Sequence, residues 1–176
     1  MSVASILRMQ TQIAHQILEG TMADVTDSQM HWAPPGIANP LGATYAHVVC
    51  SEDAIVHGML QGAPPLAATS WAGRTGLSEP MPMPGPDSDY RAWTRRVRVD
   101  LPTTRQYAQA VYAATDAYLG SLSEADLDAP LDLSSAGLGS QTLGSALAML
   151  VLNHIGTETG EIACLKGLQG ARGYPF

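Results

Sequence analysis

The sequence predicts an all-α four-helix bundle with a long irregular loop between the second and third helices. Four segments place apolar residues at helical spacing, whereas no segment alternates apolar and polar residues over more than a few positions. The chain has 176 residues, of which 45% are hydrophobic and 14% are charged. A chain of this size and composition can bury a sizeable core, so we expect residues 1–176 to form a single domain.

The charge balance argues against nucleic acid as a partner. The chain carries 9 basic and 16 acidic residues for a net charge of −7, and Lys166 is its one lysine, so no basic patch is expected. The longest apolar run, Ala146 to Leu152, is too short to span a membrane, and no membrane segment is expected. Polar residues such as Arg8 and Gln10 interrupt the N-terminal segment, so no leader is expected and the cytoplasm is the expected location. Cys50 and Cys164 lack the spacing of a zinc or redox motif, which favours reduced thiols.

The first predicted helix runs from Val3 to Glu19. One stripe at helical spacing, expected to face the core, consists of Ile6, Met9, Ile13 and Ile17. His15 lies on the opposite side of this helix from Ile6, so we expect it to face solvent. The segment from Asp27 to Pro40 is predicted to be a loop because its prolines cannot continue a helix.

The second predicted helix runs from Pro40 to Gln61, with Asn39 as its N-cap. The following segment, from Gly62 to Pro86, is rich in Gly, Pro, Ala and Ser, which predicts an irregular surface loop. A loop of this length is typically a lid, a cover or a partner contact.

Two further helices complete the predicted bundle. A short helical segment is expected from Asp87 to Val99, after which Thr103 or Thr104 caps the third major helix. The segment from Ser123 to Leu143 is predicted to be a connection. The last helix is expected from about Thr142 to Gly167.

The last predicted helix carries the pattern that bears most on function. At 100° per residue, His154, Glu158 and Glu161 fall within an apolar stripe. The apolar members of that stripe are Leu143, Leu147, Leu150, Leu165 and Leu168. Burying ionised carboxylates without a partner is unfavourable, and a bound cation would remove that cost. His154 and Glu158 are spaced i, i+4, so their side chains can reach one ion from adjacent turns.

His47 on the second helix is the predicted third ligand. The neighbours that share its face are small and leave room around it: Ala43, Cys50, Ser51, Ala54 and Gly58. A histidine between closely packed helices can instead bond to a backbone carbonyl. The presence of His154 and Glu158 on another helix favours the metal interpretation.

Four pieces of the sequence, in this order, resemble the DinB-like metal-binding four-helix bundles over nearly the whole chain. They are HWAPPG (31–36), ATYAHVVCSEDAIVHGMLQG (43–62), LSEADLDAPL (122–131) and NHIGTETGEIACLKGLQG (153–170). This family also includes bacillithiol transferases and the metal-binding domain of mycothiol-dependent maleylpyruvate isomerase.

The resemblance implies a metal held by one histidine on the second helix and by an HxxxH pair on the last helix. His47 and His154 match the first two ligands, and Gly160 to Ile162 matches the element that commonly follows the pair. Glu158 stands where the family usually has its second histidine. Two histidines and one carboxylate suit a divalent zinc, nickel, manganese or iron ion.

The function that the resemblance implies is that of a metal-dependent hydrolase, or of a transferase that uses a low-molecular-weight thiol, acting on a small electrophilic molecule. Glu161 would accept a hydrogen bond from a ligating imidazole or act as a general base, unless it pairs with an arginine between Arg91 and Arg98. The alternative is a non-catalytic ligand-binding or stress-response protein with an empty or structural metal site. Either form could be a homodimer.

Overall fold

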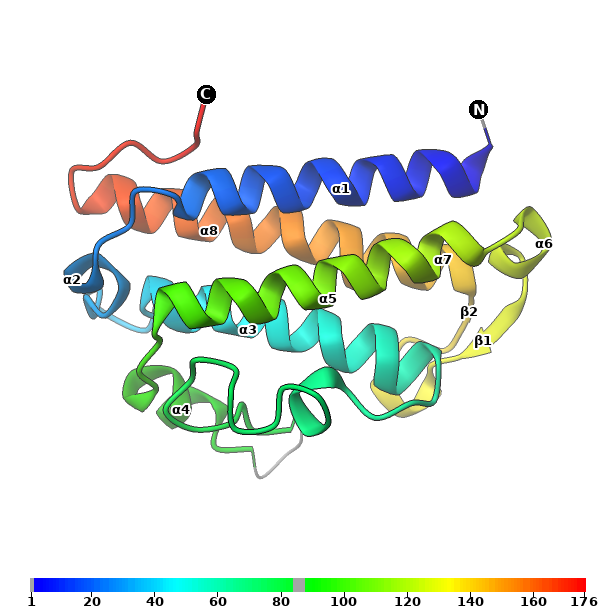
Figure 1. Ribbon diagram of the computed structural model, residues 1–176, viewed down its shortest axis with the longest axis horizontal. Coiled ribbons are helices and arrows are strands. Elements are labelled where there is room, and N and C mark those ends of the chain that lie inside the picture. Colours follow the sequence, from blue (N-terminus) through cyan, green and yellow to red (C-terminus); the bar gives the residue numbers. More distant parts are fainter. Residues whose placement is uncertain (1, 84–87) are drawn as a thin grey trace.

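The computed structural model describes residues 2–83 and 88–176 and shows four long helical rods packed side by side (Figure 1). The first and third rods are single helices, α1 (Val3–Met22) and α5 (Leu101–Ser121). The second joins α3 (Leu41–Asp53) to the π-helix η1 (Ala54–Leu60). The fourth joins α7 (Leu143–Leu147), the π-helix η4 (Ala148–Asn153) and α8 (His154–Leu168). This arrangement confirms the predicted all-α four-helix bundle.

The rods run in two directions. In Figure 1, α1 and the last rod run one way, and α3 and α5 run the other way. Because α3 and α5 are parallel, the chain must return along the bundle between them. Residues 61–100 make this crossover, which includes the 3₁₀ turn η2 (Leu66–Ala68) and the helix α4 (Tyr90–Arg96).

The crossover covers the segment that was predicted as a surface loop and the one that was predicted as a short helix. Pro84 to Pro86, at the end of that loop, lie outside the described residues, and so does Asp87, where the short helix was expected to begin. The observed α4 is shorter than predicted, because Val97 already has an extended backbone. Leu77 and Val99 then form an isolated antiparallel bridge that ties the two sides of the crossover together.

The predicted core face of α1 is wrong. Ile6, Met9 and Ile13 are 43%, 37% and 39% exposed. The buried residues of this helix are instead Leu7, Thr11, His15, Leu18, Thr21 and Met22. His15, expected in solvent, is only 8% exposed because its Nε2 lies 3.1 and 2.9 Å from the two carboxylate oxygens of buried Glu52. A hydrogen-bonding carboxylate on another helix therefore decides which side of α1 faces inward.

The second rod begins and ends close to the predicted positions. Pro40, not Asn39, is the N-cap, and its carbonyl accepts the first helical hydrogen bond from the Thr44 amide. The last turns widen into η1, where each hydrogen bond spans one residue more than in an α-helix. Gly62, with φ of +63°, follows the rod in a left-handed conformation that glycine adopts without strain.

The connection between α5 and the last rod contains short elements. Ser123 caps α6 (Glu124–Leu127), and β1 (Pro130–Asp132) pairs antiparallel with β2 (Ser140–Thr142), placing Pro130 opposite Thr142. The 3₁₀ turn η3 (Ser134–Ala136) lies between the two strands. The sequence did not predict this hairpin, because a three-residue strand is too short to show alternation.

The caps of the two later rods differ in how well they were predicted. Asp100, not a threonine, caps α5, and its carboxylate accepts a hydrogen bond from the Thr103 amide at 2.8 Å. Thr142, given as the approximate start of the last helix, is its N-cap, and its hydroxyl oxygen accepts a hydrogen bond from the Ser145 amide.

The leucine stripe predicted for the last rod is wrong in part. A π turn contains an extra residue, so residues before η4 are rotated by about 100° relative to those after it. Leu147 and Leu165 of the predicted stripe are buried and share the core face with Val151, Ile155 and Ile162, whereas Leu168 is 65% exposed.

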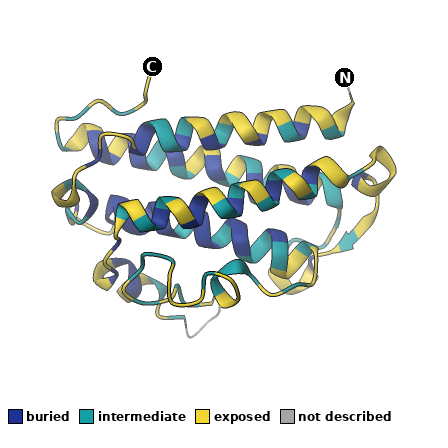
Figure 2. Ribbon diagram, in the orientation of Figure 1, coloured by how far each residue is buried: buried dark blue, intermediate teal, exposed yellow. Residues whose placement is uncertain are grey.

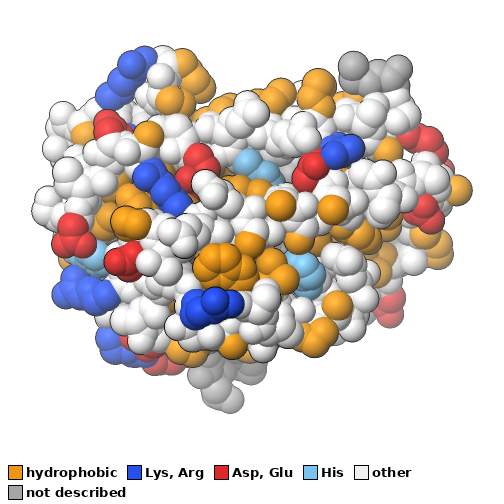
Figure 3. Space-filling model, in the orientation of Figure 1, with side chains coloured by type: hydrophobic (Ala, Val, Ile, Leu, Met, Phe, Trp, Pro, Cys, Tyr) orange, Lys and Arg blue, Asp and Glu red, His pale blue; other side chains and the backbone are white. Residues whose placement is uncertain are grey.

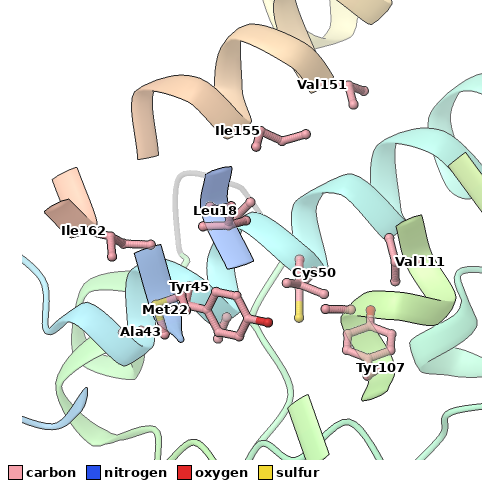
Figure 4. Close-up of a cluster of buried hydrophobic side chains, with 14 of the residues drawn as sticks. Leu18, Met22, Ala43, Tyr45, Cys50, Tyr107, Val111, Val151, Ile155 and Ile162 are labelled. Atoms are coloured by element: carbon pink, nitrogen blue, oxygen red, sulfur yellow. The ribbon is translucent and has the colours of Figure 1, made fainter. Parts of the chain in front are cut away.

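The core fills the space between the four rods. Figure 4 shows side chains from all of them meeting there, among them Leu18 of α1, Tyr45 of α3, Tyr107 of α5 and Ile155 of α8. Figure 2 shows the same distribution, with buried residues on the inner sides of the helices. Among the described residues, no helix is both long enough and apolar enough to cross a membrane.

Candidate metal centre

His47 lies in the second turn of α3, against the last rod. Its Nε2 is 3.1 Å from the Nε2 of His154, across the interface between the two rods. Its other ring nitrogen, Nδ1, is 3.2 Å from the hydroxyl oxygen of Ser51, one turn farther along α3. When Nδ1 carries the proton and donates it to Ser51, Nε2 keeps a free lone pair directed at α8.

The other two predicted ligands lie on α8, directly after the π-helix. His154 Nε2 is 3.8 Å from the Oε1 atom of Glu158, one turn along the helix. One donor atom from each of His47, His154 and Glu158 can be chosen so that all three atoms lie within 4.8 Å of one another. The side chains of His154 and Glu158 are each 22% exposed, so the group is reached from solvent.

Burial sets the charge state of this group. Burial, with a smaller effect from the neighbouring His154, lowers the pKa of His47 to about 4. Burial also lowers the pKa of His154, which the charge of Glu52 partly offsets. Burial and the nearby charge of Glu161 raise the pKa of Glu158. Both imidazoles are therefore neutral near pH 7, the form in which histidine binds a metal.

The geometry fits a divalent transition metal. An ion about 2.0–2.1 Å from each of two nitrogens in tetrahedral geometry separates those nitrogens by about 3.3 Å. The observed separation between the Nε2 atoms of His47 and His154 is 3.1 Å. Two imidazoles and one carboxylate are a donor set suited to such ions, and three protein ligands leave coordination positions for other molecules.

Glu161 lies close to the group without being part of it. Burial raises the pKa of Glu158 and that of Tyr90 on α4, and the charge of Glu161 adds a smaller effect to each. Across residues 2–83 and 88–176, no hydrogen bond or ion pair joins the Glu161 side chain to another residue. Arg96, one of the arginines considered as its partner, pairs with two other carboxylates. The predicted role of Glu161 as a hydrogen-bond acceptor or general base stays a prediction.

The remaining histidines on the loops and on η1 have other partners. The Nε2 atom of His31 accepts a hydrogen bond from the Val99 amide at 3.1 Å. His57 Nδ1 lies 2.9 Å from the carboxylate of buried Asp53. Both histidines therefore help to hold the crossover and the end of the second rod, as expected for residues outside the ligand set.

The sequence was compared with known families and structures. A family model of the DinB superfamily matches residues 10–155, which include His47 and His154. The chain belongs to the DinB superfamily. No curated protein matches the sequence. The fold of this DinB chain is similar to the crystal structure of a conserved protein from Enterococcus faecalis, with a TM-score of 0.75 and 20% identity over 96% of this chain and 97% of that chain. At that identity, the likeness shows the fold alone.

A small pocket of about 210 Å³ opens beside His154 of this DinB chain. Besides His154, it is lined by Ser51, Ile55, Met149, Leu150, Asn153 and Thr157. Three of these residues belong to η4, which brings apolar and polar side chains to the edge of the ligand group. π turns inside helices are frequently found at functional sites.

Two side chains that contact His47 were not predicted as part of the site. Ser51 is spaced i, i+4 from His47 and shares its helix face, so this spacing was a signal that could have identified it. Tyr90 lies on α4, and its ring centre is 5.1 Å from that of His47 in an edge arrangement. The sequence contains no comparable signal for Tyr90, because only the path of the crossover brings α4 against α3.

Proposed function

We propose that this DinB superfamily chain binds a divalent transition metal through His47, His154 and Glu158 and is a metal-dependent enzyme for a small electrophilic substrate. The observation that carries the proposal is the pair of neutral imidazoles, whose Nε2 atoms from different rods lie 3.1 Å apart. Glu158 adds a carboxylate to the same group. Zinc, nickel, manganese and iron all suit this donor set.

The side chains around the group have distinct roles in this proposal. A bound ion would supply a Lewis acid and lower the pKa of a water or thiol attached to it. Ser51 holds His47 in the tautomer that directs Nε2 toward α8. The pocket beside His154 receives the substrate, and its volume of about 210 Å³ limits the substrate to a small molecule.

Hydrolysis and thiol-dependent transfer are the two reactions proposed for this site. In hydrolysis Glu161 takes up a proton as a general base, and in transfer a low-molecular-weight thiol is the second cofactor. Cys50 and Cys164 are both free thiols, which supports the proposed cytoplasmic location.

Metal content tests the ligand set. We expect protein purified without a metal-affinity tag to retain one transition-metal ion per chain after dialysis. His154→Ala and Glu158→Gln should each lose the ion, because each removes a donor atom. Glu161→Gln is the matched control for Glu158→Gln, since it makes the same change one turn away on the same helix, and it should keep the ion.

Two results would contradict this assignment. One is a His154→Ala variant that keeps a full equivalent of tightly bound metal. The other is a folded wild-type protein that takes up none of added zinc, nickel, manganese or iron.

The second candidate is a non-catalytic small-ligand-binding or stress-response protein, favoured by the contacts of His154. Its Nε2 lies 3.1 Å from His47 Nε2 and 3.8 Å from Glu158, so the three side chains can satisfy one another without an ion. Absence of metal uptake, together with binding of small apolar molecules that is weakened by Met149→Ala, would support this candidate.

A further inference from the structure

A second pocket lies between the second rod and the crossover, and we call it the crossover pocket. It has a volume of about 540 Å³, compared with about 210 Å³ for the pocket beside His154. Its floor is formed by Cys50, Asp53 and Ala54 of the second rod, and its walls come from crossover residues between positions 65 and 83. Figure 3 shows hydrophobic side chains gathered over the crossover, in the lower half of the view. The two pockets share no lining residue, so the crossover pocket is a separate site.

The wall of the crossover pocket is mainly apolar. The apolar side chains that the crossover contributes to it include Pro65, Leu77, Met81 and Met83. Protein interiors are close-packed and leave few voids larger than a water molecule, so packing alone does not call for a hollow of this size. An apolar hollow also holds water poorly and binds apolar molecules instead. The volume lies within the range of about 300–1,000 Å³ in which proteins bind small organic molecules.

The two carboxylates in the wall already have partners. Asp53 is fully buried and accepts hydrogen bonds from the Tyr107 hydroxyl at 2.6 Å and from the backbone amides of residues 66 and 67 at 2.8 and 2.9 Å. Glu79 forms an ion pair with Arg96 at 2.9 Å. Among the described residues that line the pocket, there is no lysine, arginine or histidine. An anionic ligand would be repelled and a cationic one would find no free carboxylate, so the pocket favours an uncharged molecule.

Cys50 adds a neutral thiol to the floor. Burial raises the pKa of this thiol to about 12, so it stays protonated at neutral pH. A buried, protonated thiol is a poor nucleophile. The floor can therefore contact a ligand without reacting with it.

Hydrogen bonds along the crossover fix the shape of the pocket. The Asp53 carboxylate ties the floor to η2 through the two backbone amides given above. The Ser78 amide donates to the Arg98 carbonyl at 2.9 Å, and the Arg98 amide donates to the Ser78 hydroxyl oxygen at 2.8 Å. Met83, by contrast, is 77% exposed and lies at the mouth, where its flexible side chain can adapt to a ligand. The pocket is thus largely formed before a ligand binds, as is usual for small-molecule sites.

We propose that the crossover pocket binds an uncharged, mainly apolar organic molecule through non-covalent contacts. The volume, the apolar wall and the lack of a free charge among the described lining residues select this class. The π-helix η1 begins at Ala54 in the floor, and π turns are frequent at functional sites. The proposal does not depend on metal binding, because none of the three proposed metal ligands lines the pocket.

A matched pair of fluorescent dyes tests the class of ligand. The dye N-phenylnaphthylamine is uncharged, and anilinonaphthalenesulfonate has the same ring framework with an added sulfonate. We expect each wild-type chain to bind one molecule of the neutral dye, with increased fluorescence, and to bind the sulfonate about tenfold more weakly or worse.

A variant that fills the floor tests the position of the site. Ala54→Leu should weaken binding of the neutral dye by about tenfold or more, because the larger side chain occupies space in the pocket. Ala113→Leu makes the same change at an exposed position of α5 outside the pocket, so it is the matched control and should bind as the wild type does. Circular dichroism shows whether each variant keeps its helix content.

Methionine methyl groups report directly where the dye binds. In wild-type protein with isotope-labelled methionine, the neutral dye should shift the NMR signals of Met81 and Met83. It should leave the signal of Met149, in the pocket beside His154, unchanged. This measurement uses the wild-type chain, so it remains decisive if Ala54→Leu does not fold.

Four results would overturn the proposal. They are a folded wild-type chain that does not bind the neutral dye, equal affinity for the two dyes, a folded Ala54→Leu chain with unchanged affinity, and a shift at Met149 in place of Met81 and Met83.

Discussion

His15→Phe is expected to destabilise the protein by about 3 kcal/mol, the upper end of the range for leaving a buried hydrogen-bond acceptor without its partner. Glu52 is 1% exposed, and its two carboxylate oxygens lie 3.1 and 2.9 Å from His15 Nε2. One of these oxygens also accepts a hydrogen bond from the Thr115 hydroxyl at 2.6 Å. His15 stacks on Tyr112 with ring centres 3.9 Å apart, and phenylalanine keeps that stacking and most of the volume. The variant therefore removes mainly the polar contact, while Thr115 still donates to the carboxylate.

Urea unfolding at pH 7, followed by tryptophan fluorescence, measures the loss directly. Heating should show a midpoint lower by about 6–12 °C for a chain of this length. The double variant His15→Phe/Glu52→Leu is the control, because replacing both partners by apolar side chains removes the unpaired carboxylate and should restore most of the stability. A loss below about 1 kcal/mol in His15→Phe, or a double variant no more stable than the single one, would refute this account of the core.

Three further predictions follow from individual contacts. Ser51→Ala removes the partner of His47 Nδ1 and should weaken zinc binding by about 10- to 100-fold in a calorimetric titration, and unchanged affinity would contradict the role given to Ser51. In chelator-treated protein, the pKa of His47 is about 4, below its value of about 6.5 in the unfolded chain. The unfolded chain therefore binds the proton first as the pH falls, so the contribution of His47 to the free energy of unfolding is full above pH 6.5 and drops by about 3 kcal/mol by pH 4. A plot of the free energy of unfolding in urea against pH should be less steep for His47→Asn, and an equal slope would contradict this role of His47. Tyr107→Phe removes the hydroxyl that donates a hydrogen bond to Asp53 at 2.6 Å, so it should lower the free energy of unfolding in urea by about 1.5–3 kcal/mol. An unchanged stability would mean that the hydrogen bonds from the backbone amides of Leu66 and Ala67 are enough to satisfy that carboxylate.

The helical rods could be predicted from the sequence because their signals are local. Apolar spacing located all four, and Thr142 marked the start of the last one through a hydroxyl that bonds to an amide three residues away. The two π-helices could not be predicted, because they differ from α-helices by one residue per turn and depend on how the rods pack. The leucine stripe predicted for the last rod is buried at Leu147 and Leu165 but exposed at Leu168.

Two members of the proposed ligand group could also be predicted from spacing within a single helix. His154 and Glu158 are one turn apart on a single helix, so their proximity follows from helix geometry. His47 on the facing rod was predicted from the small residues that share its helix face, and the resemblance to the DinB-like bundles implied the same residue. Tyr90 was not predicted, because it reaches the group through a crossover of about 40 residues whose path no local pattern specifies.

By itself, the sequence determined that the chain forms a helical bundle, where its rods lie and which three side chains could hold an ion. Only the tertiary structure decided which side of α1 is buried. The isoleucine stripe has the periodicity of a core face, yet the structure buries the opposite side, where His15 meets Glu52. Periodicity identifies the two sides of a helix, but the surface that covers each side belongs to another part of the chain or to another chain.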